Sequence, residues 1–184
     1  MLPRKELQER VNWDEFVQAL MRKTRLQTKQ RFDHLYHLLV DSNNEVTIHK
    51  FNHMVSWFGY FFVAERANHV LDEIRDIVER PWFHGEIDIT HAESVLQDKP
   101  AGTYLVRLST TYAQYPFTLS LSGKQHKRIK KEVVQGQIVF SIVLPDKKTV
   151  RRASSLIELL DAVAKPFNLL TPCPKDEMIS NPYE

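Results

Sequence analysis

The stretch TYLVRLS (103–109) contains a single arginine in an otherwise apolar run of β-forming residues. Side chains alternate between the faces of a strand, and this stretch has large apolar side chains on both faces, which is typical of a central strand covered on both sides. Arg107 lies on the same face as Leu105. Burying a guanidinium without a partner costs several kcal/mol. Either an internal carboxylate or an anion brought by a partner must therefore offset that cost.

A second basic strand supports the anion interpretation. In HKRIKK (126–131), the period of two places His126 and Arg128 on one face, and pairing within the same sheet would bring that face next to Arg107. Hydroxyl donors follow Arg107 directly in a loop, at Ser109, Thr110 and Thr111. A guanidinium fork matches a phosphate group with two parallel hydrogen bonds. The stretch 103–131 contains no Asp or Glu, which weakens the alternative of an internal ion pair.

Outward from this strand, the C-terminal half reads as an antiparallel sheet with a helix on either side of it in the sequence. We expect strands at 103–109, 116–122, 126–134 and 137–143, with turns at Gly123 and Gly136. A helix over 90–97 precedes them, with Thr90 as N-cap and Glu93 completing a capping box. A second helix follows Ser154 or Ser155 and stops before Pro166.

The N-terminal half carries a different pattern. Apolar residues recur at helical spacing in four stretches, which begin at Trp13, Phe32, Phe51 and Ala67. Four such stripes predict a small helical bundle. The last helix should end at Arg80, because Pro81 disfavours helical geometry in the residue before it. The predicted class is therefore α+β, with a helical part followed by a sheet and its two helices.

The second half resembles the SH2 (Src homology 2) family. The matching segments, in the family's order, are WFHGEI (82–87), THAESVLQ (90–97), GTYLVRLS (102–109), HKRI (126–129), SSLIELLDAVAK (154–165) and NLLTPCP (168–174). The resemblance implies a phosphotyrosine-binding module of intracellular signalling that is not an enzyme. It also implies the division 1–80 for the helical part, 81–176 for the SH2 domain and 177–184 for a tail.

The resemblance assigns roles residue by residue. Arg107 would hold the phosphate bidentately, and Ser109, Thr110 and Thr111 would add phosphate contacts. His126 would line the tyrosine pocket, and Arg128 would pack on the phenol ring or reach the phosphate. Three positions depart from the family pattern: Ile89 replaces an arginine that often touches phosphate, Leu108 replaces an acidic residue, and Lys127 replaces an aromatic one. Lys127 falls at a position that in the family often contacts the peptide residues C-terminal to the phosphotyrosine. An acidic residue in that part of the peptide is therefore compatible with Lys127.

The helical half resembles a degenerate EF-hand. Asp41, Asn43 and Glu45 take the first three ligand positions of a calcium loop. Position six is Val46 instead of Gly, and position twelve is Asn52 instead of the bidentate Glu, so the loop should bind calcium poorly. A helix pair of this shape without metal is the alternative. An EF-like part that leads into an SH2 domain resembles the phosphotyrosine-binding region of Cbl-type ubiquitin ligases or the linker and SH2 region of STAT-type transcription factors.

The tail sequence NPYE contains Tyr183, a candidate phosphorylation site. In STAT-type proteins such a tyrosine binds the SH2 domain of a second copy, whereas the alternative is an ordinary tail tyrosine. Two other functions stay open: an assembly protein whose SH2-like half no longer needs phosphate, and a calcium-responsive adaptor. Monomer and dimer are equally compatible with the sequence.

Composition narrows the function classes further. The chain has 184 residues, a formal net charge of +2 and one cysteine, Cys173. The near-neutral charge gives no reason to expect nucleic-acid binding, and no apolar run is long enough to insert across a membrane. The eight histidines are scattered without a metal-binding spacing, so no metal or cofactor is expected.

The N-terminus lacks the apolar run of a secretory signal, and a cytoplasmic or nucleocytoplasmic location is expected. The partners implied are tyrosine-phosphorylated proteins or peptides.

Overall fold

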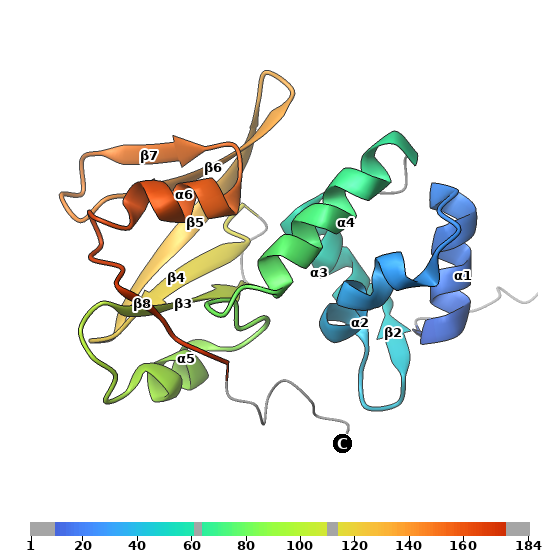
Figure 1. Ribbon diagram of the computed structural model, residues 1–184, viewed down its shortest axis with the longest axis horizontal. Coiled ribbons are helices and arrows are strands. Elements are labelled where there is room, and N and C mark those ends of the chain that lie inside the picture. Colours follow the sequence, from blue (N-terminus) through green and yellow to red (C-terminus); the bar gives the residue numbers. More distant parts are fainter. Residues whose placement is uncertain (1–9, 61–63, 110–113, 176–184) are drawn as a thin grey trace, which may run out of the picture. The chain divides into compact units, whose positions relative to one another are not determined.

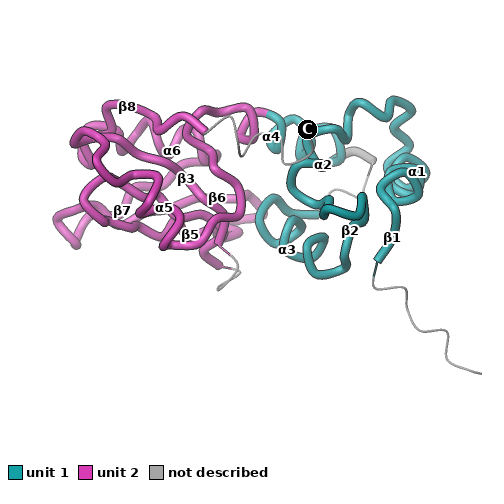
Figure 2. Tube along the Cα trace, turned by 90° about the horizontal axis from the view of Figure 1, so that it is seen from below, with its two compact units in different colours: residues 1–75 teal, residues 76–184 magenta. Residues whose placement is uncertain are grey.

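A computed structural model of the chain describes residues 10–60, 64–109 and 114–175. It divides into two compact units, residues 1–75 and 76–184 (Figure 2). The division falls inside helix α4 (Ala64–Val78), slightly before the boundary expected between residues 80 and 81.

The first unit forms from the predicted amphipathic stripes. Its helices are α1 (Trp13–Thr24), α2 (Asp33–Leu39), α3 (Ile48–Phe58) and most of α4, and a short 3-10 helix (Lys29–Phe32) leads into α2. The stripes supply buried residues, among them Val17, Leu20, Phe32, Leu35, Leu39, Met54, Trp57, Phe58, Ala67, Leu71 and Ile74. A two-stranded antiparallel ribbon, β1 (Arg10–Asn12) with β2 (Glu45–Thr47), was not expected from the sequence.

The second unit is built on one six-stranded sheet (Figure 1). The strands run in the order β7-β6-β5-β4-β3-β8. Their bounds are β3 (Thr103–Leu108), β4 (Phe117–Leu121), β5 (Gln125–Val134), β6 (Gln137–Val143), β7 (Val150–Ala153) and β8 (Thr171–Pro172). All neighbours are antiparallel except β3 and β8. The four predicted strands are present within one or two residues, whereas β7 and β8 were missed.

Two helices flank the sheet, α5 (Ile89–Leu96) and α6 (Leu156–Val163) (Figure 1). The buried side chains Ala92 and Leu96 of α5 pack with Leu105 of β3 and with Cys173. Helix α6 lies against β6 and β7 and buries its apolar stripe, which consists of Leu156, Leu159, Leu160 and Val163. The predicted α+β class is confirmed, and the Arg107 strand β3 lies inside the sheet, between β4 and β8.

The start of α5 corrects one prediction. Asp88, not Thr90, is the N-cap, and its Oδ1 accepts a hydrogen bond from the backbone N–H of His91 at 2.7 Å. Thr90 lies within the first turn, and Glu93 bonds to His126 of β5, so the predicted capping box is wrong. Aspartate caps a helix as well as serine or threonine does, so the local sequence offered two start sites of similar quality. At α6 the cap is Ser155, whose hydroxyl accepts from the N–H of Glu158.

Candidate functional site

The pairing register places the three basic residues singled out by the sequence on one face of the sheet. Arg107 of β3 is opposite Thr118 of β4, which in turn is opposite Arg128 of β5. In the next row on this face, Leu105 is opposite Ser120, which is opposite His126. Residues directly opposite each other project to the same side of a sheet. Arg107, Arg128 and His126 therefore share a face with Leu105, on which α5 packs.

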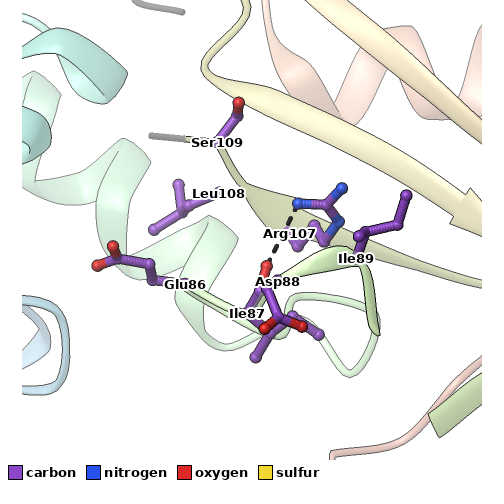
Figure 3. Close-up of a pocket in the computed structure, with 7 residues that line it drawn as sticks. All are labelled: Glu86, Ile87, Asp88, Ile89, Arg107, Leu108 and Ser109. Atoms are coloured by element: carbon purple, nitrogen blue, oxygen red, sulfur yellow. Dashed lines mark hydrogen bonds between the residues drawn. The ribbon is translucent and has the colours of Figure 1, made fainter. Parts of the chain in front are cut away.

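Arg107 is half-buried and lacks an ion pair with any described carboxylate. Its Nη1 donates a hydrogen bond to the backbone carbonyl of Ile87 at 3.3 Å (Figure 3). Its buried Nε has no hydrogen-bond partner among the residues that the structure describes. A buried donor without a partner carries the full cost of its desolvation. The guanidinium is thus held in place by one carbonyl, without an ion pair to a described carboxylate and without a described partner for its Nε.

The electrostatic environment of Arg107 also favours a bound anion. Burial lowers the pKa of the guanidinium, the carboxylate of Asp88 raises it, and the charge of Arg128 lowers it again. An arginine still keeps its proton near neutral pH, because its ordinary pKa is far above neutral. Asp88 attracts Arg107 without forming an ion pair with it, and its Oδ1 is already engaged in capping α5. An anion beside Arg107 would relieve both the desolvation and the repulsion from Arg128.

Arg107 lines a pocket of about 570 Å³ between the start of α5 and the end of β3. The lining residues are Glu86, Ile87, Asp88, Ile89, Arg107, Leu108 and Ser109 (Figure 3). Ser109 lies at the end of the strand, and its backbone N–H bonds to the carbonyl of Pro116 at 2.9 Å. Ile89 is 48% exposed, so an apolar side chain stands where the family resemblance expects an arginine. The pocket is large enough for a phosphorylated aromatic side chain.

His126 lies on the same face of the sheet as Arg107, outside the lining of this pocket, and is held from two sides. Its Nδ1 is 2.9 Å from Ser120 Oγ, and its Nε2 is 3.3 Å from Glu93 Oε1 on α5. Lys124 also approaches the same carboxylate, with Nζ at 3.7 Å from Glu93 Oε2. Sequence reasoning missed Ser120 and Glu93, because their approach to His126 depends on the strand register and on how α5 packs. The two contacts fix the orientation of the imidazole ring.

The remaining predicted binding residues have distinct places. Arg128 is exposed, and its Cζ lies 6.0 Å from the centre of the Tyr115 ring. Lys127 is opposite Leu119, so it projects to the other face of the sheet from its neighbours His126 and Arg128. Thr110, Thr111 and Tyr183 lie outside the described residues.

In the first unit, the carboxylates of the candidate calcium loop face an arginine. Asp41 Oδ1 accepts hydrogen bonds from the backbone N–H groups of Asn43 and Glu45, at 2.9 and 3.1 Å. Nη1 of Arg10 lies 3.6 Å from Asp41 Oδ2 and 3.5 Å from Glu45 Oε2. Asn43 is exposed in the turn. Throughout the described ranges, no group of three or more His, Cys, Asp or Glu side chains is arranged to hold a metal ion.

No helix in the described part of the chain has the length and apolar character needed to span a bilayer.

Comparison with known proteins adds an independent result. Residues 82–160 match the model of the SH2 domain family. The solution NMR structure of the Monosiga brevicollis CRK/CRKL homolog (crka1) SH2 domain is 25% identical and covers 52% of this chain and 88% of that one, with a TM-score of 0.37.

Two relatives match nearly the whole chain. The dual specificity protein kinase shkD of Dictyostelium discoideum is 33% identical over 194 residues, which cover 100% of this chain and 25% of the kinase. The dual specificity protein kinase shkE of the same organism is 32% identical over 191 residues, which cover 95% of this chain and 27% of the kinase. The chain thus spans about a quarter of the length of these curated relatives.

Proposed function

We propose that this chain recognises tyrosine-phosphorylated proteins through Arg107, because residues 82–160 match the SH2 domain family, whose members bind phosphotyrosine-containing peptides. One observation carries the proposal: a half-buried guanidinium lines a pocket without an ion pair to any described carboxylate, and its Nε has no described partner. A phosphate dianion accepts bidentate hydrogen bonds from a guanidinium, and such charge-assisted bonds are about twice as strong as neutral ones.

The neighbouring residues take supporting roles in this proposal. The Ser109 hydroxyl at the pocket wall donates to the phosphate, as do Thr110 and Thr111 by family resemblance. Arg128 adds positive charge from the same row of the sheet. His126 forms part of the tyrosine pocket in the orientation that Glu93 and Ser120 impose. Lys127, on the other face, contacts peptide residues that follow the phosphotyrosine.

The proposal is tested by measuring phosphopeptide affinity with Arg107 variants. A phosphotyrosine peptide array identifies a ligand for the wild type, and fluorescence anisotropy then gives its Kd for Arg107→Ala and Arg107→Lys. Loss of a desolvated charge pair costs about 2 kcal/mol or more, so we expect affinity to fall about thirtyfold or further. Lysine should not rescue binding, because it cannot form the bidentate fork.

A matched control separates this effect from a general loss of positive charge. Arg151 is an exposed arginine of β7 in the same unit and does not line the pocket. Arg151→Ala should bind the phosphopeptide like the wild type, and thermal unfolding should show that all variants fold. Equal binding of phosphorylated and unphosphorylated peptide by the wild type would refute the proposal and favour the phosphate-independent assembly function.

A second proposal concerns the setting in which recognition operates. The two relatives that match at least 95% of this chain are named dual specificity protein kinases. We propose that the SH2 domain serves a protein kinase by directing it to proteins already phosphorylated on tyrosine. The experiment measures the kinase activity that accompanies the full-length protein toward two forms of one substrate. One form carries a phosphotyrosine and the other does not. A preference for the phosphorylated substrate that Arg107→Lys removes would support the proposal, and an unchanged preference would contradict it.

A further inference from the structure

The wall of the Arg107 pocket carries negative as well as positive charge. Glu86 and Asp88 are exposed, and both line the pocket from the segment that leads into α5 (Figure 3). Neither forms an ion pair with a described residue, and Asp88 accepts a hydrogen bond from the His91 N–H. Two carboxylates therefore oppose the single guanidinium among the lining residues of the pocket.

Two carboxylates against one guanidinium is an unusual charge balance for a site that receives a dianion. The exposed residue at the start of α5 is Ile89, which brings no charge to the wall. Asp88 lies close enough to Arg107 to attract it. A phosphate bound to Arg107 would therefore come under repulsion from Asp88, and more weakly from Glu86, whose side chain points away from Arg107 (Figure 3). A positive charge on the ligand beside the phosphate would compensate both carboxylates.

We propose that Asp88 and Glu86 make this pocket select phosphotyrosine that is flanked by a lysine or an arginine. This inference rests on the proposed function of Arg107, and it adds the chemical class of the ligand: a segment with a dianion and a cation side by side. Both carboxylates are exposed, so the interaction takes place in water-rich surroundings. Coulomb's law for charges roughly 8 Å apart at a protein surface then predicts a preference of about three- to tenfold, which salt weakens.

The experiment compares phosphopeptides that differ in one flanking charge. A phosphotyrosine peptide that binds the wild type is made with Gln, Lys or Glu immediately before the phosphotyrosine, and in a second set immediately after it. Kd is measured at low and at high salt for the wild type and for Asp88→Asn, Glu86→Gln and the double variant. Asparagine caps a helix as well as aspartate does, so Asp88→Asn removes the charge and keeps the start of α5.

In one of the two sets, we expect the wild type to bind the Lys peptide about three- to tenfold more tightly than the Glu peptide at low salt. The preference should shrink in each single variant and disappear in the double variant. Asp98→Asn is the matched control: Asp98 is an exposed turn residue outside the pocket lining, with a φ of 59° that asparagine also tolerates. This variant should keep the full preference.

The outcomes separate this inference from the function on which it rests. If no phosphotyrosine peptide binds, or if Arg107→Ala binds as the wild type does, the proposed function fails. If binding requires Arg107 but is indifferent to the flanking charge in both sets, the function stands and the selection by Asp88 and Glu86 is refuted. A preference for lysine that persists in the double variant would also refute it, because other residues would then be its cause.

Discussion

Arg107 on β3 and Arg128 on β5 are both aligned with the same residue, Thr118 on β4 between them. Two cationic side chains therefore occupy one row on one face of the sheet, and the charge of Arg128 lowers the pKa of Arg107. Like charges directly opposite each other destabilise a sheet, and with one strand between them the two arginines repel each other more weakly. Such a local conflict with stability is typical of a functional site, where the missing negative charge comes from a ligand.

We therefore expect Arg107→Met to stabilise the unliganded protein while it abolishes phosphopeptide binding. Methionine keeps much of the side-chain volume but removes the repulsion from Arg128 and the desolvated Nε. Replacing buried charge by apolar groups often stabilises a protein by 1–4 kcal/mol, and because Arg107 is only half-buried we expect about 1 kcal/mol or less. Urea denaturation measures the difference in the free energy of unfolding.

The control for this measurement is Arg151→Met, at an exposed position of β7. It should change neither stability nor binding appreciably. If Arg107→Met instead lowers the free energy of unfolding, Arg107 contributes to the folded state through its bond to Ile87 more than its burial costs, and the conflict inferred for this row does not exist.

A second prediction concerns Ile89, the apolar residue of the pocket wall that stands where the family resemblance expects an arginine. Ile89→Arg places a guanidinium at an exposed wall position that faces the same pocket as Arg107. A hydrogen bond to a charged group contributes about 1.5–3 kcal/mol, so phosphopeptide affinity should rise about tenfold or more. Isothermal titration calorimetry with one phosphopeptide measures the change.

The new cation lies at the N-terminus of α5, where the helix dipole disfavours it, so a small decrease in Tm should accompany the gain. Thr90→Arg serves as the comparison, because Thr90 is exposed in the same helical turn but does not line the pocket. Equal gains in both variants would show that the effect is general electrostatic attraction and not a contact within the pocket.

Much of the fold was predictable because its signals are local and periodic. The four apolar stripes of the first unit and the four longer strands of the second unit follow directly from residue spacing, and the family match of residues 82–160 confirms the SH2 resemblance. Strands β7 and β8 were missed for physical reasons. Strand β7 has the sequence VRRA with exposed arginines, and β8 has two residues, so neither carries an alternating apolar pattern.

The candidate site was predictable only in part for a similar reason. Arg107 stands out because its own strand is apolar, and His126 and Arg128 follow from the period of two. Glu93 and Ser120, which hold His126, come from another helix and another strand, so only the tertiary arrangement brings them together. Asp88 and Glu86 face the pocket for the same reason.

A third prediction concerns pH and the loop between α2 and β2. The pKa of Asp41 is lowered, chiefly because its carboxylate accepts a hydrogen bond from the Asn43 N–H; burial opposes this, and the Glu45 N–H and the charge of Arg10 lower the pKa further. A group whose pKa is lower in the folded state stabilises that state above its unfolded pKa, near 4, and loses this contribution as the pH falls through the folded pKa.

Asp41→Asn should therefore lower Tm at pH 7, and the difference from the wild type should narrow as the pH falls below about 4. Thermal denaturation of both proteins between pH 7 and pH 3 measures this difference. A gap in Tm that stays constant over the whole range would show that the carboxylate charge of Asp41 does not contribute, and that only its hydrogen-bond geometry matters.

The last prediction decides whether this loop senses calcium. Arg10 lies within 3.6 Å of the carboxylates of both Asp41 and Glu45, so a positive charge already stands between two of the oxygens that a calcium ion would need. A calcium loop also needs a glycine at the sharp turn in position six, where this chain has Val46, which is buried in β2. It needs a bidentate glutamate in position twelve, where this chain has Asn52. We expect millimolar calcium to leave the Tm of the wild type unchanged.

Arg10→Ala should lower Tm slightly, because the two carboxylates then repel each other, and calcium should restore part of that loss by replacing the guanidinium. Lys29→Ala removes another surface cation of the same unit, one that pairs with Asp14 at 2.6 Å, and its Tm should not respond to calcium. A rise in the Tm of the wild type with calcium would contradict this reasoning and would make the first unit a calcium sensor.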